Sequence, residues 1–246
     1  MALHFLLDDP TGARVGDAVT LTGSEAHHAA AVRRVRSGEQ VTVGDGRGAW
    51  LTGECEAVTP REVVVRITHR IDTPAATPRI VLAQALAKGD RDELAVQAAT
   101  ELGVDEIVPW QAARSISRWD SAKAEKGRTR WASIVREAAK QAHRAWIPDV
   151  AALETTAALA GRGAASVIVV LEPTAPRRLT ELGLRADDPR DVILVVGPEG
   201  GISPRELELF ADAGAALVHL GPEVLRTSTA GPAALAVLAA RLGRWA

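Results

Sequence analysis

The stretch VVGPEGGISPREL, Val195–Leu207, predicts a strand, a glycine-rich loop and a helix in direct succession. The apolar strand ends at Gly197, and the helix opens after Ser203, with Pro204 in its first position and Glu206 three residues beyond the serine. That order is the pattern of a capping box. The loop glycines let the backbone approach a ligand closely, and ligands of open α/β sheets bind outside the carboxyl ends of strands. The loop is therefore a candidate binding site, although a tight turn that binds nothing explains it equally well.

Neither common phosphate-binding motif is present in this loop. It contains no GxxxxGK followed by Ser or Thr, and no GxGxxG. It also follows the fourth strand expected in its part of the chain, whereas the dinucleotide fingerprint follows the first. A nucleotide-dependent oxidoreductase is therefore disfavoured.

The sequence around the loop alternates apolar runs with helical segments. Strands are expected at 80–86, 106–110, 167–173, 192–197 and 216–221, and helices near 91–102, 122–145, 204–213 and 229–242. Continuous apolar strands alternating with helices predict an α/β fold with a parallel sheet that is covered on both faces.

The first seventy or so residues have a different character. Strands are expected at 19–23, 40–46, 50–58 and 62–71, with one helix at Ser24–Arg36 that Ser24 would cap. These segments predict a small β-barrel or curled sheet. The following DTPAATPR, Asp72–Arg79, has the composition of a linker. We therefore expect a barrel over 1–72, a linker over 73–79 and an α/β domain over 80–246.

Composition narrows the function classes. The 246 residues include 29 Lys or Arg and 31 Asp or Glu, a formal net charge of −2, and 47% are hydrophobic, which is typical of a globular protein. The single Cys55 excludes an intrachain disulfide and a thiolate metal cluster, and we expect no metal site. No uncharged apolar run approaches about 18 residues, so we expect no membrane span. The start MALHFLLDDP lacks the features of a signal peptide, which predicts a cytoplasmic protein.

A second loop follows the last expected strand, which ends at Gly221. Its LRTSTA stretch, Leu225–Ala230, leads into an Ala/Leu-rich helix, and Thr227 and Ser228 are natural N-caps. Helix capping alone would explain these hydroxyl residues. Because this loop and the Gly197 loop both follow parallel strands, the two could also form two walls of one cleft.

These motifs together resemble a known family. GPEGGIS with Glu206 and Phe210, LGP at 220–222 and LRTxTA look like the 16S ribosomal RNA uridine N3-methyltransferases, the RsmE type of the SPOUT superfamily. Further resemblance covers almost the whole chain, in KGDR (88–91), QAATELGVDEIVP (97–109), ARS (113–115) and RWASIVREAAKQAHRAWIPDV (130–150). The chain departs from the family pattern at Val35, where a Leu precedes the Arg, and at Ser228, where LRTETA has a Glu.

The resemblance implies a PUA-like N-terminal barrel that helps to grip RNA, and a C-terminal domain with a deep trefoil knot. It implies S-adenosylmethionine as cofactor and a homodimer with the active site between protomers. Carried over residue by residue, the cofactor site is Gly197, Pro198, Glu199, Gly200, Gly201, Leu220, Gly221, Leu225, Arg226, Thr227, Thr229 and Ala230.

The charge distribution points to where RNA would bind. Residues 111–148 contain nine Lys or Arg and three Asp or Glu, a net charge of +6. Arg136, Lys140 and Arg144 are four residues apart and would share one helix face, which is typical of a phosphate contact or simply of a solvated face. The candidate RNA-binding residues are Arg33, Arg34, Arg36, Lys88, Arg114, Arg136, Lys140 and Arg144.

The implied reaction transfers a methyl group to N3 of a uridine in 16S ribosomal RNA, either naked or within the small subunit. N3 carries a proton at neutral pH, so either a general base removes it or cations stabilise the developing anion. The candidate cations are Lys88, Arg91, Arg114 and Arg226, and the candidate base is Glu199 or Glu137. His219 is expected inside a buried strand and is set aside. The alternatives are a SPOUT RNA methyltransferase that acts on another base or on a ribose 2′-hydroxyl, and a non-catalytic RNA-binding protein.

Overall fold

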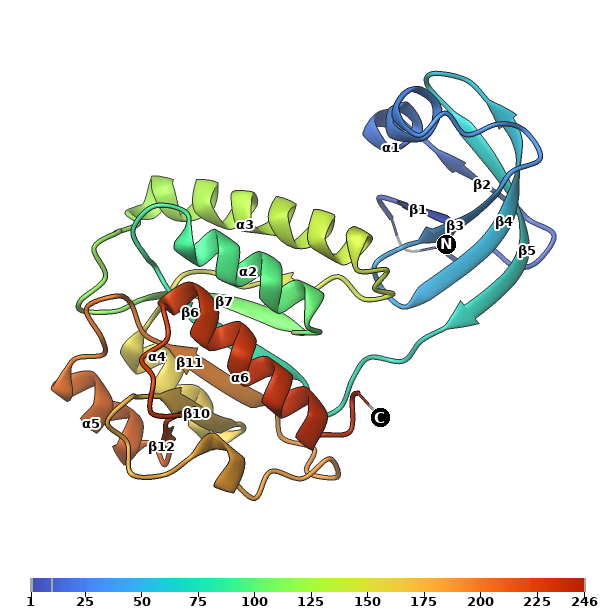
Figure 1. Cartoon of the computed structure of the whole chain (residues 1–246). Coiled ribbons are helices and arrows are strands. Elements are labelled where there is room, and N and C mark those ends of the chain that lie inside the picture. The colour runs from blue at the N-terminus through green and yellow to red at the C-terminus, as the bar shows by residue number, and fades with distance from the viewer. Residues whose placement is uncertain (1, 10, 246) are drawn as a thin grey trace. The chain divides into compact units, whose positions relative to one another are not determined.

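The structure is a computed structural model that describes residues 2–9 and 11–245. The chain divides into two compact units, each with its own sheet (Figure 1). The first unit contains the described residues up to Ala75 together with Ala139–Ile147, and the second contains Ala76–Ala138 and the described residues from Pro148 onward. That residues 139–147 join the first unit was not indicated by the sequence. Among the described residues, no helix is long and apolar enough to cross a membrane.

The first unit is built on a five-stranded sheet with the order β1-β3-β4-β5-β2. Its strands are β1 (Leu3–Leu6), β2 (Ala18–Leu21), β3 (Gln40–Gly44), β4 (Ala49–Val58) and β5 (Val63–Asp72). β1 pairs with β3 in parallel, and the other pairs are antiparallel. Alternate residues of the strands point inward, so that Phe5, Val43, Leu51 and Val65 form the core of the unit. The β-rich character expected from the sequence is confirmed, whereas β1 was not expected.

The helix expected over Ser24–Arg36 is shorter and irregular in the structure. α1 covers Gly23–His27 and continues as the π-helix η1 (His28–Val32), and its N-cap position is held by Thr22 rather than Ser24. The helix ends there because Arg34 adopts a positive φ of 55°, which no α-helical residue can have. This part of the prediction was wrong at both ends.

The second unit contains a seven-stranded sheet with the order β12-β10-β11-β6-β7-β8, and β9 also pairs with β7. Its strands are β6 (Ile80–Ala85), β7 (Glu106–Gln111), β8 (Asp149–Val150), β9 (Glu154–Thr155), β10 (Val167–Leu171), β11 (Val192–Val196) and β12 (Ala216–Val218). All pairs are parallel. The carboxyl ends of the strands consequently lie at one edge of the sheet, and the predicted parallel α/β sheet is confirmed.

Helices cover both faces of this sheet (Figure 1). They are α2 (Arg91–Glu101), α3 (Ser121–Gln141), α4 (Thr156–Gly161), α5 (Pro204–Asp212) and α6 (Thr227–Arg241), with short 3₁₀ turns η2 (Arg162–Ala164) and η3 (Leu179–Glu181). α2 packs against α6, and α4 packs against α5. Val195 faces the cluster that contains Phe210 of α5, while its neighbour Val196 approaches Gly231 of α6. Successive strand residues thus point to opposite faces of the sheet, and both faces are covered by helices. These strands are therefore apolar throughout.

Candidate functional site

A cavity of about 400 Å³ lies at the carboxyl ends of β10, β11 and β12. Most of the predicted cofactor residues line it, namely Gly197, Pro198, Glu199, Gly201, Leu220, Gly221, Leu225, Arg226, Thr227 and Ala230. Gly200 and Thr229 do not line it. Several wall residues at or after the ends of β10 and β12 were not predicted from the sequence, among them Leu171, Glu172, Pro173, His219, Glu223 and Val224. The two strand-end loops therefore do form two walls of one cleft.

The glycine loop needs its glycines for two reasons. A Cβ at Gly197 would lie 2.7 Å from Cγ1 of Ile202, which is closer than real Cβ atoms approach. Gly201 has a φ of +71°, a conformation that side chains with a Cβ rarely adopt. The capping box predicted at Ser203 is confirmed, since Ser203 and Glu206 each bond to the other's backbone N–H. The loop is thus held in a single conformation at the carboxyl end of β11.

Glu206 also links this loop to two others. Its Oε1 accepts hydrogen bonds from the Ala113 N–H and from the Thr156 hydroxyl, each at 2.8 Å. Burial alone would raise the pKa of Glu206, but the bonds from Ala113, Ser203 and Thr156 outweigh it and keep the pKa below its usual value. Next to Ala113, the guanidinium of Arg114 donates to the Gly200 carbonyl oxygen at 3.1 Å. Glu206 is therefore a structural link that places Arg114 against the glycine loop.

Glu199 is committed to hydrogen bonds at the rim of the cavity. Its Oε1 accepts from the Lys88 backbone N–H at 3.1 Å and from Nη1 of Arg91 at 2.7 Å. Burial favours a higher pKa for Glu199, but hydrogen bonds from backbone N–H groups and from Arg91 hold the pKa below its ordinary value. A carboxylate with a lowered pKa is a weak base at neutral pH. The geometry thus suits Glu199 to holding Arg91 better than to removing a proton.

Thr227 connects the glycine loop to the last helix. Its Oγ1 donates to the Gly197 carbonyl oxygen at 2.8 Å and accepts from Nε2 of Gln84 at 2.9 Å. Thr227 is the first residue of α6, and the N-cap position belongs to Arg226, so the prediction that Thr227 or Ser228 caps the helix was wrong. Gln84 is fully buried. The one polar residue inside the apolar strand IVLAQAL is this glutamine, which is the sequence signal for the buried hydrogen bond.

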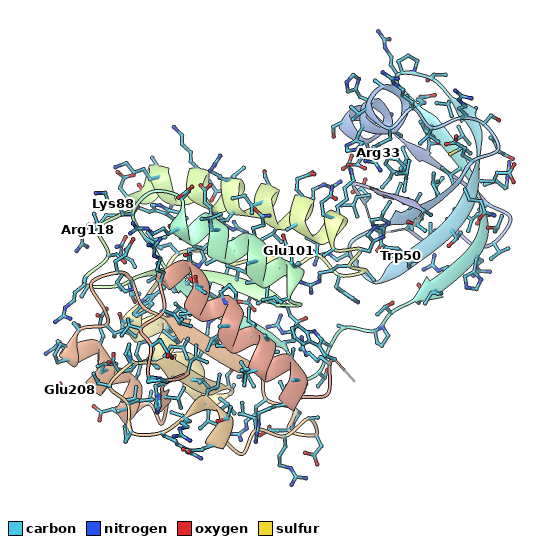
Figure 2. The ribbon with its side chains drawn as sticks, viewed as in Figure 1. Arg33, Trp50, Lys88, Glu101, Arg118 and Glu208 are labelled. Carbon is cyan, nitrogen blue, oxygen red and sulfur yellow. The ribbon has the colours of Figure 1, made fainter. Side chains whose placement is uncertain are left out.

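Arg226 is the least constrained cation at the cavity. Its side chain lines the wall, is exposed, and makes no hydrogen bond or ion pair with any described residue. The guanidinium of Arg91 bonds to Glu199 of the glycine loop, and that of Arg114 bonds to the Gly200 carbonyl oxygen, whereas Lys88 bonds to Glu199 through its backbone N–H. Figure 2 shows Lys88 and Arg118 at this end of the second unit. Positive side chains therefore gather at the carboxyl edge of the sheet.

His219 occupies a different place from the one expected. β12 ends at Val218, so His219 lies just beyond the strand and lines the cavity. Its Nδ1 is 3.2 Å from the Gly221 carbonyl oxygen, so Nδ1 carries the hydrogen and donates it. The prediction that His219 lies inside a buried strand was wrong, because the strand predicted over 216–221 ends at Val218.

The basic helix face predicted over Arg136, Lys140 and Arg144 is not present as such. α3 ends at Gln141, and His143 has a positive φ of 52°, so Arg144 lies beyond the helix. Lys140 is 4% exposed, and its ammonium group lies 2.7 Å and 2.9 Å from the two carboxylate oxygens of Glu25 in the first unit. A lysine buried in this way has no free charge for RNA.

The remaining predicted residues are placed as follows. Arg33, Arg34 and Arg36 are exposed on the first unit, at the end of η1. Arg136 is half-buried and has a partner, which leaves it less free than the helix spacing suggested. Glu137 is exposed on α3 and does not line the cavity, so the structure does not bring it to the other candidate groups.

Each of the two units resembles a known family of protein domains. The pattern of the RNA methyltransferase domain matches residues 74–239, and that of the RNA methyltransferase PUA domain matches residues 21–68. The chain is 40% identical to ribosomal RNA small subunit methyltransferase E of Mycobacterium bovis, over 100% of this chain and 94% of the relative. It is 30% identical to the protein of that name from Bacillus subtilis, over 86% of this chain and 85% of the relative.

Solved structures agree with these matches. Ribosomal RNA small subunit methyltransferase E from Neisseria gonorrhoeae, bound to S-adenosyl methionine, superimposes with a TM-score of 0.86 at 28% identity, covering 98% of each chain. A methyltransferase from Legionella pneumophila in complex with the same cofactor also gives a TM-score of 0.86, at 31% identity and 98% coverage of each chain. With its PUA-like first unit and its parallel-sheet second unit, the chain belongs to the ribosomal RNA small subunit methyltransferase E family.

Proposed function

We propose that this protein methylates N3 of a uridine in 16S ribosomal RNA, with S-adenosylmethionine as the methyl donor. The observation that carries the proposal is the cavity at the carboxyl ends of β10 to β12, with the guanidinium of Arg226, which has no partner within residues 2–9 and 11–245, in its wall. The relatives' names supply ribosomal RNA as the class of substrate, and the Neisseria and Legionella structures supply the cofactor.

The cavity has the size and lining that the cofactor needs. Its volume of about 400 Å³ falls within the range of small-molecule sites, roughly 300–1,000 Å³. Leu220, Leu225 and Ala230 offer apolar surface for an adenine ring, while the glycines expose backbone N–H and C=O groups to its edges. Gly221 leaves open space, since a Cβ there would meet only the Glu223 carboxylate, at 3.4 Å. When bound, S-adenosylmethionine supplies an electrophilic methyl group on its sulfonium sulfur.

The chain's own residues would prepare the uridine. N3 lies on the pairing edge of the base, so the uridine must be unpaired or flipped out to reach the cavity. We assign Arg226 to the uracil oxygens, where its guanidinium stabilises the negative charge that develops as N3 loses its proton to water. Arg91, held by Glu199 at 2.7 Å, adds a second positive charge. In this scheme Glu199 positions a cation and takes no proton.

We further propose the trefoil knot and the SPOUT assignment. β12 lies at the edge of the sheet, yet α6, which follows it, packs against the central strands β11 and β6. The segment between them returns from the edge to the centre, where Thr227 bonds to the Gly197 carbonyl. This return path beneath the glycine loop supports a threaded chain. The functional division that we propose is a PUA-like RNA-binding barrel over 1–72, a linker over 73–79 and the knotted domain over 80–246.

We also propose that the protein forms a homodimer. Val224 is 76% exposed and Leu225 is 38% exposed, although both line the cavity wall, and large apolar side chains at a site's rim are typical of an interface. We propose that a second copy covers this rim, and that the protein acts in the cytoplasm on naked 16S RNA or on the small subunit. Light scattering after gel filtration tests the dimer.

The central experiment incubates the protein with methyl-labelled S-adenosylmethionine and either naked 16S RNA or small subunits, followed by mass spectrometry of the nucleosides. We expect 3-methyluridine at one position, and loss of it with Arg226→Ala but not with Arg205→Ala, an exposed arginine of α5 outside the cavity. Label on another base or on a ribose 2′-oxygen would replace the proposal with a different methyltransferase activity. RNA binding without any transfer of label would leave a non-catalytic RNA-binding protein.

A further inference from the structure

A second cavity, of about 160 Å³, lies wholly within the first unit. Its polar lining consists of His4, His28, Arg33, Lys140, Gln141 and His143, which come from β1, from η1 and from the segment at the end of α3. No residue of the cofactor cavity takes part in it. Figure 2 marks Arg33 on this unit. As far as the structure describes the chain, the lining contains basic, neutral polar and apolar side chains and no carboxylate.

The positive charge in this lining is only partly neutralised. Lys140 is paired with the buried Glu25, which also accepts a hydrogen bond from the Leu6 backbone N–H at 3.1 Å. That pair is electrically balanced and is fixed by the core of the unit. Arg33 is exposed, and its guanidinium makes no hydrogen bond or ion pair with a described residue. Arg33 therefore places a positive charge and guanidinium N–H groups at the cavity, where they can donate hydrogen bonds to a ligand.

His4 forms a neutral part of the lining. Its ring stacks on Trp50 with the centroids 4.1 Å apart, and its Nδ1 lies 3.0 Å from the Thr42 hydroxyl. Burial, and then the positive charges of His143 and Lys140, lower the pKa of His4 to about 3. His4 is consequently uncharged at neutral pH, chiefly because its ring is buried.

Two residues with a strained backbone lie in the lining of this cavity or next to a lining residue in the sequence. Among the described residues other than glycine, Arg34 and His143 are the two with positive φ, at 55° and 52°. Arg34 follows Arg33, and His143 lines the cavity itself. Conformations of this kind persist where the surroundings enforce them, and they cluster at binding sites.

We propose that this cavity binds a phosphate group of the RNA backbone, with Arg33 as its principal contact. The inference rests on the proposed function, because RNA is the substrate that would supply the phosphate. A volume of about 160 Å³ is smaller than typical ligand sites of roughly 300–1,000 Å³ and suits a phosphate group rather than a whole nucleotide. A guanidinium beside further N–H donors, without an opposing carboxylate, is the arrangement that recognises phosphate oxygens.

The test compares Arg33→Ala with Arg61→Ala. Arg61 is also an exposed arginine of the first unit, but it lies in the turn between β4 and β5 and does not line the cavity. Both variants lose one positive charge, so a general electrostatic effect would be the same in both. Binding of a labelled 16S RNA fragment is measured by fluorescence anisotropy over a series of salt concentrations. We expect Arg33→Ala to weaken binding and to reduce the salt slope by about 1, with a clearly smaller change for Arg61→Ala. Equal behaviour of the two variants overturns the proposal.

A second variant, His143→Asn, tests the site from its other side. Asparagine tolerates a positive φ, so the backbone conformation is retained while the imidazole is lost. We expect weaker RNA binding with an unchanged circular dichroism spectrum. Inorganic phosphate, titrated as a competitor, should displace RNA from the wild type more readily than from Arg33→Ala. If phosphate binds to the wild type and not to Arg33→Ala, while the two proteins bind RNA equally, the site holds free phosphate and the assignment to RNA is wrong.

Failure of this inference can be told apart from failure of the proposed function. Binding of S-adenosylmethionine by calorimetry and transfer of label to RNA are measured in parallel on the wild type. If neither occurs, the methyltransferase proposal fails, and the comparison of Arg33→Ala with Arg61→Ala still decides whether the cavity contacts RNA.

Discussion

The hydroxyl of Thr227 donates a hydrogen bond to the carbonyl oxygen of Gly197 at 2.8 Å, which joins the first turn of α6 to the end of β11. The same hydroxyl oxygen accepts from Gln84 of β6 at 2.9 Å. One side chain therefore connects three segments that lie far apart in the sequence, and all three meet beneath the glycine loop. The shape of the cofactor cavity depends on this connection.

Thr227→Val should destabilise the protein and weaken cofactor binding. Valine has nearly the shape of threonine but leaves the Gly197 carbonyl oxygen without its donor, at a cost of about 1–3 kcal/mol. It also removes one of the two acceptors of the buried Gln84 side-chain amide, which keeps only the Ala85 carbonyl oxygen. Thr229→Val is the matched control, because Thr229 is exposed and does not line the cavity. Urea unfolding gives the free energies of unfolding, and calorimetry gives the affinity for S-adenosylmethionine. Equal values for the two variants would contradict the role given to Thr227.

Arg226→Ala should slow methyl transfer without unfolding the protein. Arg226 is exposed and unpaired within the described residues, so its removal breaks no hydrogen bond or ion pair among them. If its guanidinium stabilises the developing charge, kcat should fall by about 10²-fold, as for the loss of one oxyanion donor. The comparison is with Arg205→Ala, measured as kcat and KM for RNA. Unchanged kinetics for Arg226→Ala would remove Arg226 from the mechanism.

Glu199→Gln should lower stability at neutral pH more than at acid pH. The pKa of Glu199 lies below its usual value because hydrogen bonds from backbone N–H groups and Arg91 outweigh burial. A carboxyl whose pKa is lowered by folding adds stability above its unfolded pKa of about 4.3, and this stability is lost as the pH falls through the folded value. The difference in Tm between the wild type and Glu199→Gln should therefore shrink between pH 7 and pH 3.

The control for this change is Glu208→Gln, which alters an exposed carboxylate of α5 (Figure 2). Its Tm should follow the wild type throughout the pH range. A difference for Glu199→Gln that stays constant from pH 7 to pH 3 would show that the ion pair with Arg91 contributes nothing. Retained methyl transfer by Glu199→Gln at saturating cofactor would agree with its role as a positioning group.

The sequence predicted those features that depend on neighbouring residues. Continuous apolar runs such as VILVV identified a strand buried on both faces, and the spacing of Ser203 and Glu206 identified a capping box that the structure contains. Contacts between distant residues could not be read in this way. The hydrogen bond from Gln84 to Thr227 spans 143 positions, and neither residue indicates the other locally. The same holds for Lys140, whose helical spacing predicted an exposed basic face.

Lys140 should be needed for folding rather than for RNA binding through a surface charge. It is 4% exposed and pairs with Glu25, which is 7% exposed and lies 115 positions away. Lys140→Met would leave the buried Glu25 carboxylate without its partner, which typically costs about 3–5 kcal/mol. Lys123→Met removes a lysine from an exposed pair with Asp120 and should cost at most about 1 kcal/mol. Urea unfolding of both variants provides the comparison.

The double variant Glu25→Gln, Lys140→Met separates the ion pair from the space that it fills. Replacing both charges removes the uncompensated carboxylate, so the double variant should recover much of the stability that Lys140→Met loses. The Leu6 backbone N–H, which donates to Glu25 at 3.1 Å, can still donate to the glutamine side-chain oxygen. If the double variant is as unstable as Lys140→Met alone, the loss comes from packing of the lysine stem. In that case the charge of Glu25 is not what requires a lysine at this position.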